Sequence, residues 1–296
     1  MGKYIVTICL IKMQGDKERT KVKKGRLKVT LIVTCYNSKQ NLIGTLDSIL
    51  KQSYNPLEIV IVDGASTDGT IDIIKKYAAS NKERFDIRWI SESDHGIYDA
   101  MNKGYRMSTG DVIAFFNDKF LMNNAIEMMV DVIERTQSDG AHADLIYATD
   151  TKVKRYWKMG TGRISQGWMP GHPTLYLKRE VYETYGLYRP EYSCSADFEF
   201  MVRILKDDKV KLAYVPETII SMYYGGTSTA DANSYWISIK ESHKALVDNG
   251  VKRGWFIILL RTVRTLIQFA SARFYQRRNE RLQNRESDDN NAQNCN

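Results

Sequence analysis

Two stretches of the chain, Val29-Thr-Leu-Ile-Val-Thr-Cys-Tyr-Asn37 and Glu58-Ile-Val-Ile-Val-Asp-Gly-Ala-Ser-Thr-Asp-Gly-Thr70, decide the fold class. Each begins with a run of β-branched and aliphatic residues and stops abruptly at polar residues that form turns. Buried parallel strands have this continuous apolar character, and open α/β sheets bind ligands at the carboxyl ends of such strands. The two stretches therefore predict neighbouring strands with a ligand site where both end.

The segment between these strands is predicted to be a helix, capped by Asn37 or Ser38. Apolar residues recur there at a spacing of three or four, at Leu42, Leu46, Ile49 and Leu50. That spacing places them on one helix face. A second helix is predicted over 70–77, after the polar turn. A strand, a crossover helix and a second strand form a βαβ unit, so the predicted fold class is α/β.

Four motifs, in this order, resemble glycosyltransferase family 2. They are Thr34-Cys-Tyr-Asn37, Val62-Asp-Gly-Ala-Ser-Thr-Asp-Gly-Thr70, Ser91-Glu-Ser-Asp-His-Gly-Ile-Tyr-Asp-Ala-Met-Asn-Lys-Gly104 and Thr109-Gly-Asp-Val-Ile-Ala-Phe-Phe-Asn117. The resemblance covers roughly 28–224 and is closest in character to short bacterial enzymes of capsule, exopolysaccharide and lipopolysaccharide synthesis. It implies a GT-A fold, a Rossmann-like and mostly parallel mixed sheet with helices on both faces.

The chain of 296 residues suits one such domain with short extensions. We expect the GT-A domain at 28–245, after an N-terminal extension at 1–27 that packs on a sheet edge. The segment 279–296 has almost no apolar residues and is expected to be disordered. The four cysteines show no CxxC spacing, which argues against a zinc site or a disulfide framework. No cleavable signal sequence is visible, so a cytoplasmic location is expected.

A basic amphipathic helix is predicted at 250–278. Its apolar face consists of Trp255, Leu259, Val263, Leu266, Ile267, Ala270 and Phe274. Arginines such as Arg261 and Arg264 border this face and interrupt the run too often for a transmembrane helix. With the net charge of +8, the pattern favours binding in the plane of an anionic membrane surface. Packing on the globular body with the basic face in water, or dimer packing, are the alternatives. No motif for nucleic-acid binding accompanies the charge, so no nucleic-acid partner is expected.

The ends of the first two strands supply the first donor-binding candidates. The resemblance implies that Asp63 accepts hydrogen bonds from the base or ribose of a nucleotide sugar, and that Tyr36 and Asn37 line the same site. Relatives often have a second acidic residue after the first, where this chain has Gly64. An alternative is that Asp63 only caps its turn.

Further donor-binding candidates are Asp94, Asp99 and Asn102, in a segment that runs from a loop into a helix. Asp99 and Asn102 are three residues apart and share a helix face, and one of the three could instead be a helix cap. His172, between Gly171 and Pro173, resembles a loop histidine that touches donor phosphates or acceptor. A purely structural role is its alternative.

The metal motif departs from the family pattern. Relatives read Asn, a small residue and two aspartates, whereas this chain reads Asn117-Asp118-Lys119-Phe120. Asp118 would be the single carboxylate ligand of Mg²⁺ or Mn²⁺, with donor phosphates and water supplying the other oxygens. Two alternatives stay open. Lys119 replaces the cation, or activity is lost.

The segment Tyr192-Ser-Cys-Ser-Ala-Asp-Phe-Glu199 resembles the acceptor-side motif in which an Asp at a helix start is the catalytic base, here Asp197. An ordinary acid at a helix N-terminus is the alternative. The resemblance implies an inverting glycosyltransferase that moves a sugar from a nucleotide-diphosphate donor to a lipid-linked or oligosaccharide acceptor in cell-surface polysaccharide synthesis. The other hypotheses are a non-catalytic member that binds nucleotide sugar or glycan, and a basic module that binds membranes or polyanions.

Overall fold

The computed structural model describes residues 25–149, 152–224 and 232–293, and the expected N-terminal extension at 1–27 lies outside this part apart from 25–27. The described strands are β1 (Val29–Cys35), β2 (Leu57–Asp63), β3 (Asp86–Ser91), β4 (Val112–Phe115), β5 (Lys119–Phe120), β6 (Gly140–Ala148), β7 (Val153–Trp157), β8 (Tyr176–Lys178) and β9 (Leu212–Tyr223). The described helices are α1 (Lys39–Leu50), α2 (Thr70–Asn81), α3 (Ile97–Met107), α4 (Ala125–Thr136), α5 (Arg179–Tyr185), α6 (Ala196–Leu205), α7 (Ala232–Asp248) and α8 (Gly254–Gln293), with short 3-10 turns at Ile164–Gln166 and His172–Thr174.

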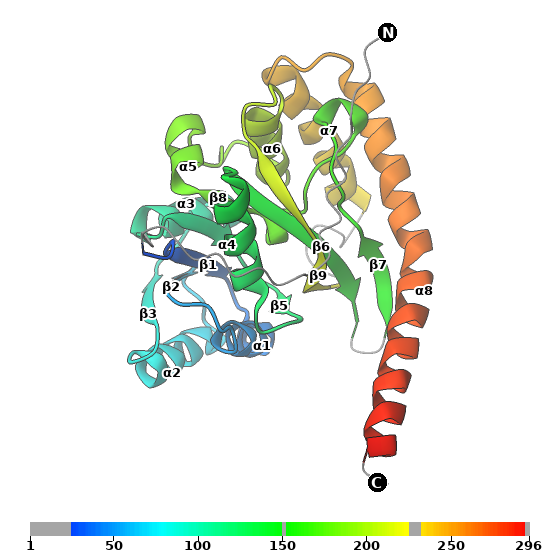
Figure 1. Ribbon diagram of the computed structural model, residues 1–296. Helices are drawn as coiled ribbons and strands as arrows, with labels where there is room; N and C mark the ends of the chain where they lie inside the picture. Colours follow the sequence, from blue (N-terminus) through cyan, green and yellow to red (C-terminus); the bar gives the residue numbers. More distant parts are fainter. Residues whose placement is uncertain (1–24, 150–151, 225–231, 294–296) are drawn as a thin grey trace.

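These strands form one mixed sheet in the order β3-β2-β1-β4-β8-β6-β9-β5, with β7 paired to β6 (Figure 1). The four strands β3, β2, β1 and β4 are parallel, while β8 runs antiparallel to both β4 and β6. Every residue of β1 and β2 is buried, as their unbroken apolar runs require. The predicted α/β class is confirmed. The chain reverses its direction of strand addition between β1 and β4, and ligands of such sheets bind at that point.

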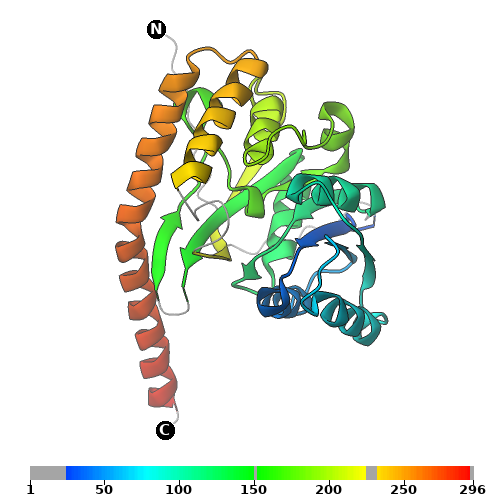
Figure 2. The same ribbon diagram turned by 180° about the vertical axis from the view of Figure 1, so that it is seen from behind.

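Helices cover both faces of the sheet, as Figures 1 and 2 show from opposite sides. The predicted face of α1, with Leu42, Leu46 and Ile49, joins one buried cluster together with α2 and α4. The opposite cluster contains residues of α3, α5, α6 and α7, such as Met101 and Phe200. Burial of both faces leaves only the strand ends as places where polar groups can meet a ligand.

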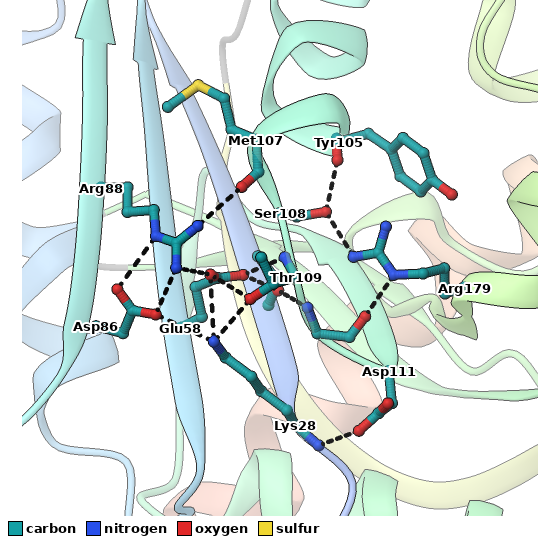
Figure 3. Close-up of polar contacts among 12 residues, drawn as sticks. Lys28, Glu58, Asp86, Arg88, Tyr105, Met107, Ser108, Thr109, Asp111 and Arg179 are labelled. Carbon is teal, nitrogen blue, oxygen red and sulfur yellow. Dashed lines mark hydrogen bonds and ion pairs between the residues drawn. The ribbon is translucent and has the colours of Figure 1, made fainter.

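The amino ends of the parallel strands are held by a buried carboxylate, Glu58, at the centre of a polar network (Figure 3). Its oxygens accept hydrogen bonds from Thr30 Oγ1 at 2.5 Å and from the Thr109 backbone N–H at 2.7 Å. Lys28 Nζ and an Arg88 nitrogen lie 3.3 and 3.4 Å away. Burial by itself would raise the pKa of Glu58, but the bonds from Thr30 and Thr109 outweigh it and lower that pKa. This network locks β1, β2 and β4 together at the edge opposite the predicted site.

The long helix α8 lies along the edge strand β7 in both views (Figures 1 and 2). It continues to Gln293, past the expected boundary at 278, so the segment up to Gln293 is helical and the expected disorder there is not observed. No glycine or proline interrupts 279–293, and Arg, Glu and Gln are good helix formers. Within the described residues, Gly254–Gln276 is the segment long and apolar enough to cross a membrane, despite its arginines.

The helix packs on the protein through the buried Ile257, Ile258 and Ala272 and through hydrogen bonds of two arginines, and it leaves most of its predicted apolar face in solvent. Arg261 Nη1 donates to Ser242 Oγ at 3.1 Å, and Arg264 Nε donates to the Gln166 carbonyl at 3.1 Å. Most of the predicted apolar face is instead strongly exposed, with exposed fractions of 59% at Trp255, 58% at Leu259, 45% at Val263, 64% at Leu266, 61% at Ile267 and 74% at Phe274. The alternative of a helix packed on the globular body agrees with the contacts of α8 to β7 and α7 and with the exposure of Arg264 and Arg273. The predicted apolar face is nevertheless mostly in solvent.

Candidate active site

The carboxyl ends of β1, β2 and β3 bring Tyr36, Gly64 and Asp94 together. A Cβ added to Gly64 would stand 2.6 Å from Asp94 Oδ2 and 3.3 Å from Tyr36 Cδ2. The Asp94 carboxylate thus fills the space that a side chain at position 64 would need. Tyr36 is 66% exposed and offers a flat aromatic surface next to this carboxylate. An exposed ring beside an acceptor group is suited to holding a planar, hydrogen-bonding ligand such as a nucleotide base.

Asp63 does not face this opening. It is fully buried, and it accepts hydrogen bonds from the Ser66 N–H at 2.9 Å, from Ser66 Oγ at 2.5 Å and from Ser91 Oγ at 2.7 Å. Direct contact between Asp63 and a base or ribose does not fit this geometry, because its acceptor capacity is used inside the protein. Asp63 instead orders the turn after β2 and ties it to the end of β3, which places Asp94.

Asn37 links the first two loops of this edge. Its Oδ1 accepts a hydrogen bond from the Thr67 N–H at 3.0 Å, and its own N–H donates to Ser66 Oγ at 2.8 Å. The residue has a φ of 45°, a left-handed conformation that Asn tolerates better than most side chains. Asn37 therefore shapes the loop that carries Tyr36.

The two candidates on α3 have separate positions. Asp99 accepts a hydrogen bond from the His95 N–H at 3.1 Å, which caps the start of the helix. Burial would raise its pKa, but this bond and Lys103 outweigh burial and lower it. Asn102 is buried, and its amide donates to the Tyr188 carbonyl at 2.8 Å while accepting from the Tyr188 N–H at 3.1 Å. The prediction of donor binding does not fit Asn102, because it braces α3 against the segment before α6.

Asp197 lies in the first turn of α6, two residues after the N-cap residue Ser195, and it is half-buried. Its Oδ1 accepts hydrogen bonds from Tyr98 Oη at 3.0 Å and from the Phe198 N–H at 2.8 Å. Both bonds use the same oxygen, so within the described residues Oδ2 has no hydrogen-bond donor and could accept from a substrate hydroxyl. Glu199 is fully buried and ion-paired, so it is not a second acid for this site.

A group of aromatic rings stands behind Asp197. Tyr98 lies beside Tyr188, with ring centroids 5.8 Å apart, and the hydroxyl of Tyr188 is 2.7 Å from His172 Nε2. The His172 ring stacks on Phe115 at 5.7 Å. Burial lowers the pKa of His172, so its ring is neutral near pH 7. His172 therefore supports the rings behind the carboxylate, in line with its structural alternative. Sequence reasoning missed Tyr98 and Tyr188, although Tyr98 lies within a motif that pointed to this region.

Asp118 follows β4, where Asn117 is fastened to the end of β1 by two 2.9 Å bonds with Thr34. Burial raises the pKa of Asp118 to about 7, and no hydrogen-bond or ion-pair partner for it is present within the described residues. In the same part of the chain no group of three or more His, Cys, Asp or Glu side chains could hold a metal. A desolvated carboxylate without a partner fits one protein ligand of a cation that takes its other oxygens from substrate and water.

Lys119 lies away from this position, against α1. Its Cε is 2.5 Å from the place of a Cβ on Gly44, which is more than one helical turn beyond the start of α1 at Lys39. The alternative in which the Lys119 ammonium replaces a metal beside the leaving group stays a prediction.

Tyr147, near the end of β6, is influenced by the charges of both Asp118 and Asp197. Burial raises the pKa of Tyr147, Arg155 lowers it, and the charges of Asp118 and Asp197 raise it further. Both carboxylates thus lie within electrostatic reach of one side chain. The candidate metal ligand and the candidate base are 79 positions apart in the chain, and the charges of both act on Tyr147.

The parallel strands β3, β2, β1 and β4 place polar side chains at their carboxyl ends, where open α/β sheets bind ligands. The chain matches the description "Glycosyl transferase family 2" over residues 30–193 and belongs to that family. It is a glycosyltransferase. The resemblance noted in the sequence is therefore confirmed.

Among its relatives is the "PGL/p-HBAD biosynthesis glycosyltransferase" of Mycobacterium tuberculosis, which is 28% identical over 204 residues, 67% of this chain and 78% of the relative. "Chondroitin synthase" of Escherichia coli is 27% identical over 144 residues, 47% of this chain and 20% of that protein. The crystal structure of S. aureus TarS 1-349 in complex with UDP-GlcNAc matches with a TM-score of 0.63 at 16% identity, covering 80% of this chain and 72% of that one. A mannosyltransferase from Pyrobaculum calidifontis, in complex with GDP-Man and Mn²⁺, matches at 0.57 and 14% identity, covering 81% and 74%. These likenesses confirm the GT-A fold.

Proposed function

We propose that this glycosyltransferase moves a sugar, with inversion, from a nucleoside-diphosphate donor to a lipid-linked glycan at the cytoplasmic membrane surface. One observation carries the proposal. Tyr98 of α3 holds Asp197 at 3.0 Å, and the loop that leads into α3 holds Asp94 beside Tyr36. The same short element thus touches both the nucleotide edge and the candidate base.

The donor nucleotide lies, in this proposal, over Tyr36 and Asp94. The exposed Tyr36 ring stacks on the base, and Asp94 accepts a hydrogen bond from it. Asp94 already accepts from the Gly96 N–H at 2.9 Å through Oδ1, so Oδ2 is the oxygen for the ligand. The similar structures in complex with UDP-GlcNAc and with GDP-Man support a nucleotide-sugar donor.

Asp118 would hold Mg²⁺ or Mn²⁺ together with the donor diphosphate. The cation supplies charge neutralisation for the departing diphosphate when it is bound. The observation in favour is a partly buried carboxylate that has no ion-pair partner among the described residues, and burial raises its pKa. Mg²⁺ accepts such a site, because it often binds through one or two carboxylates and keeps several waters.

Asp197 would remove the proton from the acceptor hydroxyl as that oxygen attacks the anomeric carbon. Tyr98 orients the carboxylate through its bond to Oδ1, and Oδ2 receives the proton. Attack from the face opposite the diphosphate inverts the anomeric configuration.

The element that would bind the membrane surface is α8. Its outward side carries large apolar side chains whose burial in the headgroup region is favourable, and Arg273 on this side is exposed as well. Because the other side packs on the protein through Ile257, Ile258 and Ala272, an in-plane position fits better than a transmembrane one. An anionic surface would attract a chain with a net charge of +8.

The test is donor binding followed by transfer. A thermal-shift screen with UDP-, GDP- and dTDP-sugars, each with and without Mn²⁺, should identify a donor, because a ligand at about a hundred times its Kd stabilises the fold by ~2.7 kcal/mol. With that donor, Asp197→Asn should retain binding and lose transfer to lipid-extract acceptors by ~10²–10⁴-fold. Binding without turnover by the unaltered protein would favour the non-catalytic alternative, and near-normal turnover of Asp197→Asn would remove Asp197 from the mechanism.

A further inference from the structure

Arg155 on β7 is surrounded by aromatic rings, unlike a typical surface arginine. Its guanidinium carbon lies 4.7 Å from the ring centroid of Tyr147, 4.7 Å from that of Trp157 and 5.7 Å from that of Phe269. The side chain is half-buried. Three aromatic rings from β6, β7 and α8 therefore fix the plane of one cation.

The hydrogen-bonding capacity of this cation is mostly unused. Arg155 Nε donates to Gln268 Oε1 at 2.6 Å, and this is its hydrogen bond to the described part of the chain. No carboxylate of that part forms an ion pair with it. Burial lowers its pKa, as expected for a cation without a compensating anion. Within the described residues the two terminal nitrogens of the fork have no hydrogen-bond partner, and their geometry matches the oxygens of a phosphate group.

The position of Arg155 links the reaction centre to the apolar helix. In the sheet Arg155 is the register partner of Tyr147, the residue that both Asp118 and Asp197 influence. On its other side are Gln268 and Phe269 of α8, whose outward face is the exposed apolar surface. Arg155 thus contacts both the end of β6 and the helix that carries the exposed apolar surface.

We propose that Arg155, framed by Tyr147, Trp157 and Phe269, binds a phosphate group of a substrate. The proposal rests on the function proposed above and deepens it. Two substrates could supply this group, the donor diphosphate and the phosphate that joins an acceptor glycan to its lipid. The contact with α8 favours the lipid phosphate, since the donor nucleotide is expected at the ends of β1 and β3.

The experiment measures binding to the full-length protein by calorimetry in a neutral detergent. The probes are farnesyl monophosphate, farnesol and UDP with Mn²⁺. Arg155→Gln should weaken the binding of farnesyl monophosphate by ~10–100-fold, since hydrogen bonds to charged groups are stronger than those between neutral groups. The affinities for farnesol and for UDP should stay unchanged. Arg155→Lys keeps the charge but loses the planar fork, so its affinity for farnesyl monophosphate should lie between those of the unaltered protein and Arg155→Gln.

Lys154→Gln is the matched control, because it removes one positive charge from the adjacent, exposed position of the same strand. It should bind all probes like the unaltered protein. Unchanged UDP affinity in Arg155→Gln also shows that this variant is folded, and the thermal midpoint provides a second check.

The outcomes are distinct. A selective loss of UDP affinity in folded Arg155→Gln keeps the phosphate site and assigns it to the donor. The inference is overturned if Arg155→Gln and the unaltered protein bind farnesyl monophosphate with equal affinity. It is also overturned if the unaltered protein does not bind farnesyl monophosphate while UDP binding by the variant is unchanged. In that case transfer activity in the unaltered protein would leave the proposed function intact, whereas absence of any donor binding would count against the function itself.

Discussion

Asp118→Asn should stabilise the metal-free protein near neutral pH and abolish its response to Mn²⁺. The Asp118 carboxyl is partly buried without a partner in the described residues, and its pKa is raised to about 7. Asn has nearly the same shape and no charge, so the substitution removes the cost of ionising this group. It also removes the carboxylate proposed to bind the cation.

The direction of the pH dependence follows from the two pKa values of Asp118, 3.8 ordinarily and about 7 in the folded protein. Between these values the folded protein holds a proton that the unfolded chain releases, so the free energy of unfolding falls as the pH rises. The penalty is absent below the lower value and complete above the upper one. A shift of about three units corresponds to ~4 kcal/mol, and partial access of water reduces this to about 1–2 kcal/mol.

Urea unfolding in EDTA at about pH 4.5 and about pH 8 measures this difference. Asp118→Asn should be more stable than the unaltered protein by about 1–2 kcal/mol at the higher pH and nearly equal to it at the lower. Adding Mn²⁺ with UDP should stabilise the unaltered protein alone. Glu83→Gln, at an exposed position without an ion pair among the described residues, controls for the loss of one negative charge and should show neither effect. The reasoning is refuted if Asp118→Asn is no more stable at about pH 8 than the unaltered protein.

Three further predictions concern positions in other parts of the fold. Tyr98→Phe removes the hydroxyl that holds Asp197 and should lower kcat by ~10-fold with donor affinity unchanged, measured by steady-state kinetics; an unchanged kcat would contradict this role. Glu58→Gln should reduce the free energy of unfolding by about 1–3 kcal/mol at pH 7, and the difference should become smaller in acid. The pKa of Glu58 is lower in the folded protein than in the unfolded chain, so the ionised carboxylate stabilises the fold at a pH above the unfolded pKa. This stability is lost as the pH falls through the folded pKa. Replacing the exposed Leu259 and Leu266 by Glu should abolish flotation with anionic vesicles at an unchanged thermal midpoint, and persistent flotation would place the membrane contact elsewhere.

The sequence predicted the parallel half of the fold with good boundaries. The apolar run from Val29 ends at Cys35 as a strand, and the helix expected from Thr70 begins at that residue. Such predictions succeed where a buried element has a continuous or periodic apolar pattern, because burial on both faces leaves few alternatives. The helical continuation of α8 to Gln293 was not predicted, since composition alone does not distinguish a polar helix from a disordered segment.

The candidate site was predicted in part. Motif order pointed to the ends of β1, β2 and β3, and Tyr36 and Asp94 do lie together there. The sequence does not show which acidic or amide side chains at these ends are used internally. Asp63 and Asn102 match the motifs as well as Asp94 does, yet both are buried and hydrogen-bonded within the protein. Only the packing around each side chain decides whether a ligand can reach it.

The sequence by itself determined the α/β class, the family and the amphipathic character of the last helix, because these properties depend on local periodicity and on ordered motifs. The tertiary structure alone decided which side of α8 faces the protein, how Tyr98 meets Asp197 across 99 positions, and how Arg155 comes to lie among rings from three elements. These contacts join residues that are distant in the chain. Their geometry follows from sheet register and helix packing, which the pattern of any single segment does not contain.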